Sequence, residues 1–142
     1  MYESQGDRDN ESVVKEQILE LFKYPVIINK LPIAYQLDFG VYRERDKMLI
    51  MLLELKSRPD INIDTYPDLI LSAHKMHEAV NWYVRGKPVK LIYSLSDGLW
   101  SYTVTTDALQ LDCGLGGRKD RPDWQDMEPV YHIPRDLLTK II

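Results

Sequence analysis

The chain has 142 residues, of which 44% are hydrophobic and 28% are charged, a balance typical of one soluble domain with a hydrophobic core. Its net charge of −4 argues against a protein that coats DNA non-specifically, although residues 43–90 carry nine basic and seven acidic side chains. A single cysteine and three histidines exclude a disulfide framework and a Cys/His zinc site, and no apolar run approaches the ~18 residues that a membrane span needs.

The N-terminal segment is predicted to form a mobile arm followed by a helix. Residues 1–10 lack apolar periodicity, and their polar, acidic character is unlike that of a signal or transit peptide. An apolar stripe at helical spacing predicts a helix over residues 11–23, and it consists of Val14, Ile18, Leu21 and Phe22. Pro25 should end this helix, because the residue before a proline disfavours the helical conformation.

Three strands are predicted next. The first is a β-branched run at residues 26–28, and the second is indicated by alternating apolar and polar residues over 37–42. A polar turn at residues 44–47 connects it to a third strand at residues 48–55. This third strand is almost wholly apolar, so it should be covered on both faces of a sheet.

The second half of the chain is predicted to hold a helix, a hairpin and a loop-rich tail. The helix should open within residues 65–67, where a proline fits the first turn, and close at Gly86. Two strands within residues 89–104 should pair as a hairpin. The tail, residues 105–142, is expected to be loop-rich and to carry a short helix after Pro134.

The order of these elements, α-β-β-β-α-β-β, predicts an α/β fold in which helices flank a mixed sheet. The sequence contains no internal repeat and no sign of a second domain. Residues 11–142 are therefore expected to form one domain, with a core over residues 11–104 and the tail as an extension.

Two acidic residues, Asp38 and Glu54, fall inside apolar strands, where a bare carboxylate is costly unless it is paired or binds a cation. Lys56 follows Glu54 by two positions and so shares its face of the strand. Carboxylates on neighbouring strands can hold a divalent metal, and oxygen ligands suit Mg²⁺ or Mn²⁺. The metal would activate a water and polarise a phosphate, while the lysine would orient that water or stabilise charge developing on phosphorus.

The segments Leu37-Asp38 and 52–58, LLELKSR, resemble the PD-(D/E)xK nuclease superfamily. The closest resemblance is to archaeal Holliday-junction resolvases and small phage-encoded nucleases. The element order over residues 11–104 is similar to the restriction-endonuclease-like core of that superfamily, αβββαβ. One departure is that Leu37 stands where the motif has proline.

This resemblance implies a metal-dependent endonuclease that hydrolyses DNA, and its substrate stays open between junctions or other branched structures, flaps, nicks and plain duplex. It implies Mg²⁺ or Mn²⁺ as the cofactor and DNA as the partner. The implied catalytic and metal-binding groups are Asp38, Glu54, the Leu55 carbonyl, Lys56 and, on the first helix, Glu11. Contacts with nucleic acid are expected from Ser57, Arg58, Lys75, Arg43 and Arg45, and a further basic group follows a glycine-rich loop at Arg118, Lys119 and Arg121. For Lys75, a solvated helix face is the equally weighted alternative.

The metal site sets a condition on strand register. If Arg43 pairs with Met48 and the ladder continues regularly, Asp38 falls opposite Leu53 and the two carboxylates lie on opposite faces. An odd-length turn or a β-bulge between Asp38 and Glu54 would place these two residues opposite each other.

Two other hypotheses stay open. A catalytically inactive protein of the nuclease fold, serving in nucleic-acid binding or assembly, agrees with the acidic charge and small size. In the other, an unrelated domain uses Glu54 and Lys56 only as a strand-end salt bridge and has no metal affinity. A symmetric homodimer would present two sites to a two-fold substrate such as a junction. The expected location is the cytoplasm, that of the host if the protein is phage-encoded.

Overall fold

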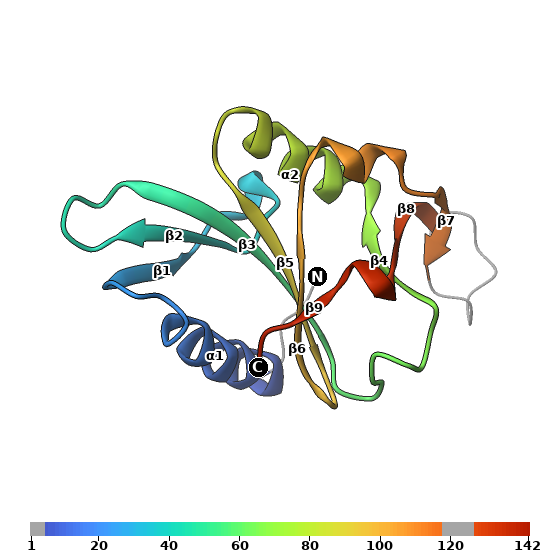
Figure 1. The fold of residues 1–142 in the computed structure, drawn as a ribbon, viewed down its shortest axis with the longest axis horizontal. Coiled ribbons are helices and arrows are strands. Elements are labelled where there is room, and N and C mark those ends of the chain that lie inside the picture. Colours follow the sequence, from blue (N-terminus) through green and yellow to red (C-terminus); the bar gives the residue numbers. More distant parts are fainter. Residues whose placement is uncertain (1–4, 118–126) are drawn as a thin grey trace.

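The computed structural model of the chain describes residues 5–117 and 127–142. In this part of the chain two α-helices accompany a six-stranded and a three-stranded sheet (Figure 1). The helices are α1 (Gln5–Leu19) and α2 (Ala73–Val84), and short 3₁₀ turns are η1 (Ile33–Tyr35), η2 (Thr106–Gln110) and η4 (Arg135–Leu137). The large sheet holds β1 (Val26–Lys30), β2 (Phe39–Arg43), β3 (Leu49–Arg58), β5 (Val89–Leu95), β6 (Gly98–Thr103) and β9 (Thr139–Lys140). The small sheet holds β4 (Asp68–Ser72), β7 (Cys113–Gly117) and β8 (Met127–Pro134).

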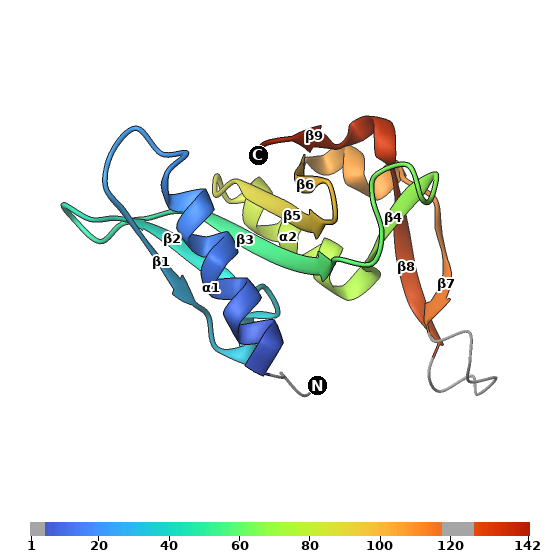
Figure 2. The same ribbon diagram turned by 90° about the horizontal axis from the view of Figure 1, so that it is seen from below.

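The large sheet is mixed, as predicted. Its strand order is β1-β2-β3-β5-β6-β9, and β3 and β5 are parallel whereas the other neighbours are antiparallel. Figure 2 shows α1 on one face of this sheet and α2 on the other. The α/β class with a mixed central sheet flanked by helices is therefore confirmed.

Strand β3 is covered on both faces, which explains why its sequence is almost wholly apolar. Leu53 packs with Val14 and Ile18 of α1, whereas its neighbour Leu52 packs with Met76 of α2. Successive side chains of a strand point to opposite faces, so the two layers alternate along β3. Glu54 therefore faces the α2 side, together with Leu52.

The bounds predicted for α1 were wrong at both ends. The helix begins at Gln5, so residues 5–10 are helical where a mobile arm was predicted, and residues 1–4 lie outside the described part of the chain. A helix that is stabilised by its apolar face can extend into a polar segment that lacks this periodicity. Adding a residue to an existing helix costs less free energy than nucleating a new one. The helix ends at Leu19, where the backbone N–H groups of Leu21 and Phe22 turn back to carbonyls three residues earlier.

The predicted start of the second helix was also wrong. Residues 68–72 form strand β4, and α2 begins only at Ala73, where the Ser72 hydroxyl accepts a hydrogen bond from the Lys75 N–H. Leu69 and Leu71 pair with residues of β8 far along the chain, so their spacing belongs to a strand. Gly86 does close the helix, with a φ of +86° that favours glycine.

The tail is part of the core instead of a loop-rich extension. Strands β7 and β8 build the small sheet with β4, and β9 joins the edge of the large sheet. Tyr131, Ile133 and Leu138 are buried in the same apolar cluster as α2. The segment after Pro134 is the 3₁₀ turn η4. The core therefore does not stop at residue 104.

Candidate active site

A β-bulge aligns the two acidic strand residues. The Arg43 N–H donates to the Met48 carbonyl at 2.9 Å, and Tyr42 pairs with Leu49. Val41, however, pairs with Met51, so Ile50 is the extra residue. Phe39 then pairs with Leu53, and continuing this register places Asp38 opposite Glu54. The predicted condition on register is met by a bulge.

Asp38 is fixed at the point where β2 begins. Its carboxylate Oδ2 accepts a hydrogen bond from the Leu55 N–H at 2.8 Å, and its carbonyl accepts one from the Leu31 N–H at 2.8 Å. The Asp38 side chain is half-buried. A rigid backbone therefore places this carboxylate at the edge of β3, beside Glu54.

Glu54 is the buried acid of the site, with 1% of its surface exposed. Its Oε2 accepts a hydrogen bond from the Lys75 ammonium at 2.5 Å, whereas its buried Oε1 has no hydrogen-bond partner among the described residues. Burial and, after it, the Asp38 charge raise the pKa of Glu54, Lys75 and Lys56 oppose both effects, and the net value is about 7. An orphaned buried carboxylate oxygen beside a second carboxylate suits a cation.

Two lysines approach Glu54 from different elements. Lys56 lies two residues further along β3, on the same face, and makes no ion pair with a described residue. Lys75 comes from the first turn of α2, and only 21% of its side chain is exposed. The solvated alternative for Lys75 is therefore wrong. The ion pair of Glu54 with Lys75, in place of the hypothesised pair with Lys56, was not visible in the sequence because the predicted helix began too early.

Glu11 lies on the other side of the large sheet. It pairs with Lys30 at 3.3 Å and lines a small hollow with Leu53 and Leu55, which face α1. The structure thus brings Asp38, Glu54, Lys56 and Lys75 together but does not place Glu11 with them. A catalytic role for Glu11 stays a prediction that these contacts do not support.

The remaining predicted DNA contacts lie at both ends of β3. Ser57 and Arg58 are exposed at its C-terminal end, and Arg58 contacts Asp60 at 3.4 Å. Arg43 and Arg45 lie at the opposite end, about 20 Å from Glu54 if β3 rises about 3.3 Å per residue. The third group, Arg118, Lys119 and Arg121, lies outside the described residues.

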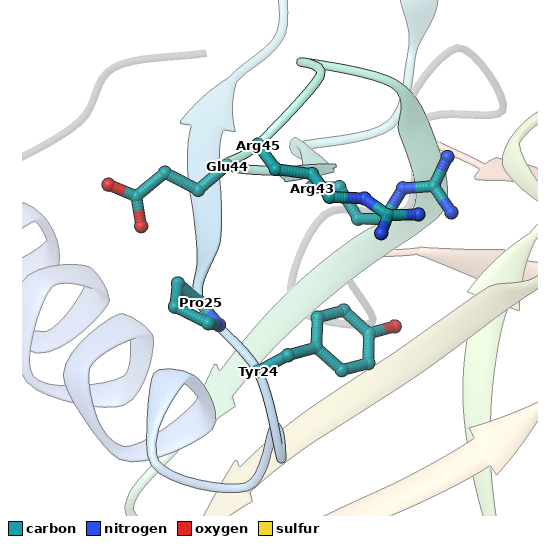
Figure 3. A pocket seen from close by; sticks show the side chains of 5 residues that line it. All are labelled: Tyr24, Pro25, Arg43, Glu44 and Arg45. Atoms are coloured by element: carbon teal, nitrogen blue, oxygen red, sulfur yellow. The ribbon is translucent and has the colours of Figure 1, made fainter.

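Arg43 and Arg45 line an open hollow of about 670 Å³ with Tyr24, Pro25 and Glu44 (Figure 3). The Arg43 guanidinium bonds the Asp46 carboxylate at 2.7 and 3.1 Å, which holds the pKa of Asp46 below its usual range. Figure 3 shows the Glu44 side chain extending away from both guanidinium groups. Arg45 is exposed and makes no ion pair with a described residue, so its charge is available to an external anion.

The donor set limits which metal the site can take. Within residues 5–117 and 127–142 there is no cluster of three or more His, Cys, Asp or Glu side chains that could hold a metal. A metal at Asp38 and Glu54 would need further oxygen ligands from backbone and water. The Leu55 carbonyl is suitably directed, because a strand residue points its N–H and C=O to the same side and this N–H points to Asp38. Such a set fits Mg²⁺ or Mn²⁺.

Comparisons with known proteins agree with this geometry. A family model described as "Phage putative PDDEXK endonuclease" matches residues 1–141. A solved structure, D212, a nuclease from a fusselovirus, superposes with a TM-score of 0.60 and 13% sequence identity, over 99% of this chain and 89% of that one. No curated protein matches the sequence. No helix in the described part of the chain has the length and apolar character to cross a membrane.

Proposed function

The chain belongs to the phage PD-(D/E)xK endonuclease family, and we propose that it is a metal-dependent deoxyribonuclease acting at Asp38 and Glu54. The observation that carries this proposal is the bulged register that sets two carboxylates side by side, one of them with a buried oxygen that has no hydrogen-bond partner among the described residues. Burying two neighbouring carboxylates costs stability, and Lys75 offsets this cost at only one oxygen of Glu54, so a second cation would stabilise the arrangement. The observed fold agrees with that of a viral nuclease.

Asp38, Glu54 and the Leu55 carbonyl would hold the ion, either Mg²⁺ or Mn²⁺. When bound, it would supply a more acidic water and polarise the phosphate. Asp38 is positioned for this by the hydrogen bond from the Leu55 N–H. Glu54 is positioned by its strand and by Lys75. Both ligands therefore come from rigid backbone, which keeps the site preorganised.

The two lysines are proposed to act differently. Lys56 is half-buried, beside the carboxylates and without an ion pair among the described residues, so its ammonium can orient the attacking water or stabilise charge on phosphorus. Lys75 neutralises Glu54 in the metal-free protein. Once another cation takes that role, the Lys75 ammonium can turn to a phosphate oxygen of the DNA.

Arginines lie near both ends of β3, and we expect the DNA to contact them. Ser57 and Arg58 continue β3 beyond the carboxylates, and the hollow with Arg43 and Arg45 lies about 20 Å away. At 3.4 Å per base pair, that separation is about six base pairs of duplex. Selectivity for junctions or other branched DNA, and a homodimer that offers two such sites, are the finer parts of this proposal.

Cleavage of a panel of linear, nicked and branched DNA with Mg²⁺, Mn²⁺ or EDTA tests the proposal. We expect cutting only with metal, and its loss in Asp38→Asn and in Lys56→Ala. Asp136→Asn, which changes an exposed carboxylate in η4, is the matched control and should cut normally. Metal-dependent binding without cutting would instead favour an inactive nuclease fold that serves in DNA binding or assembly.

A further inference from the structure

The turn between β1 and β2, which leads into Asp38, exposes an apolar side chain. Ile33 in η1 has 95% of its surface exposed, and the next most exposed large hydrophobic side chain among the described residues, Val84, has 61%. Tyr35 in the same turn is 47% exposed. Single exposed apolar residues are common on proteins, so exposure by itself decides nothing. The position of this turn in the fold is what makes Ile33 a candidate for contact with a partner.

The turn is tied to the proposed metal ligand. The Leu31 N–H donates to the carbonyl of Asp38 at 2.8 Å, which closes the loop that carries Ile33 at its tip. Its other anchor is Leu37, the residue before Asp38, which is 2% exposed in the α2-side core. The tip is therefore only a few residues from Asp38 and is attached at both sides to the backbone that holds this carboxylate.

The tip is also rigid. The Tyr35 N–H bonds the Pro32 carbonyl at 3.0 Å, and the Gln36 N–H bonds the Ile33 carbonyl at 2.9 Å. Gln36 holds a left-handed conformation with a φ of +63°, and Pro32 has its φ fixed by the ring. The backbone that carries Ile33 is consequently held in one conformation, so binding a partner there costs little backbone entropy.

The chemistry of the residues at the tip indicates which part of the DNA the tip would contact. Residues 31–37, LPIAYQL, carry no charge, so this turn has no cationic side chain that would attract a phosphate. An aliphatic side chain and a tyrosine ring instead match the apolar faces of nucleobases. Asp38 would hold the metal that binds the phosphodiester to be cut, and the turn is tied to Asp38, so the bases adjoining that bond are the ones that Ile33 would contact.

We propose that Ile33, with Tyr35 beside it, is a wedge that enters the base stack next to the cleaved phosphodiester. This inference rests on the proposed nuclease function, and it adds an explanation of how the enzyme would select its DNA substrate. Inserting such a wedge costs the least free energy where base stacking is already disrupted, as at a branch point, nick or mismatch. The enzyme would thus prefer disrupted DNA without reading any base edge.

Fluorescence of 2-aminopurine placed beside a branch point tests the wedge without cleavage. Unstacking should raise this fluorescence when wild-type protein binds in EDTA, or when Lys56→Ala binds with Mg²⁺. Ile33→Ala should lose most of the rise, while Ile33→Met, which stays apolar and long, should keep it. The matched control is Val84→Ala, another exposed apolar position, which should behave as wild type.

Cleavage then provides the second readout. Ile33→Ala should lower the ratio of branched to linear cleavage about tenfold, with an unchanged melting temperature because the side chain packs against almost nothing. No fluorescence change with wild type, or an equal change with Ile33→Ala, overturns the wedge even if the protein cuts DNA. An Ile33-dependent change in a protein that never cuts DNA would uphold the wedge and refute the proposed catalysis.

Discussion

Replacing Glu54 by Gln should stabilise the metal-free protein at neutral and alkaline pH. The pKa of Glu54 rises from its usual 4.5 to about 7 on folding, chiefly through burial and then through the Asp38 charge. Between these values the folded chain keeps a proton that the unfolded chain has released. Because the folded state binds more protons, the free energy of unfolding falls as the pH rises through this window and levels off above pH 7.

The size of the effect follows from the same two values. At ~1.4 kcal/mol per pH unit, a rise from 4.5 to about 7 gives an upper value of about 3 kcal/mol for the cost of the Glu54 charge in the folded state. The attraction of Lys75 for that charge is already contained in this figure. Gln has nearly the shape of Glu and no charge, so the variant should melt roughly 10 °C higher at pH 8 in EDTA. At pH 4.5 most of this difference should be gone.

Thermal unfolding from pH 4.5 to pH 8 in EDTA measures this difference directly. Glu16→Gln, an exposed carboxylate on α1, is the matched control and should show no comparable gain. Mg²⁺ or Mn²⁺ at about 100 times its dissociation constant should stabilise wild type by about 2.7 kcal/mol and Glu54→Gln hardly at all. A Glu54→Gln variant less stable than wild type at pH 8 would refute the reasoning, because Glu54 would then be mainly a structural partner of Lys75.

Three further changes test other parts of the molecule. Lys75→Met removes the partner of a buried carboxylate, so the pKa of Glu54 measured by NMR titration should rise further, and an unchanged value would mean that the ion pair is absent in solution. Arg45→Ala should weaken DNA binding and reduce the slope of log affinity against log salt by about one, as seen by fluorescence anisotropy, with exposed Arg135→Ala as the control. Leu71→Ala, at the buried contact between β4 and the core, should cost about 2–5 kcal/mol in urea unfolding, whereas a small loss would mean that the second sheet is not integral to the fold.

The sequence predicted those elements whose partners are near in the chain. The turn between β2 and β3 and the hairpin of β5 and β6 can be predicted from their local sequence. In both, a polar turn separates two runs of apolar or alternating residues. Strand β4 was missed because Leu69 and Leu71 pair with residues about 60 positions later, and a spacing that also suits a helix gave no sign of this. Gly116 in β7 shows the same non-local constraint: a Cβ there would lie 2.7 Å from a Val130 side-chain atom of β8, so its glycine reflects strand packing instead of a loop.

More of the site than of the surrounding fold could be predicted from the sequence, because a buried charge is visible there as an acidic residue within an apolar strand. Asp38 and Glu54 stood out as acids among apolar residues, and the requirement that they share a face predicted either an odd-length turn or a bulge, of which the structure has the bulge, at Ile50. There was no comparable sign in the sequence for Lys75, since a lysine on a helix is expected to face solvent until the start of that helix is known. Its ammonium lies 2.5 Å from Glu54, so the metal-free fold already holds one cation against its most costly charge. Within the described part of the chain, this single ammonium leaves Glu54 Oε1 without a hydrogen-bond partner, and the pKa of Glu54 stays at about 7. A second positive charge would therefore stabilise the ionised Glu54 at the place where catalysis would need a metal.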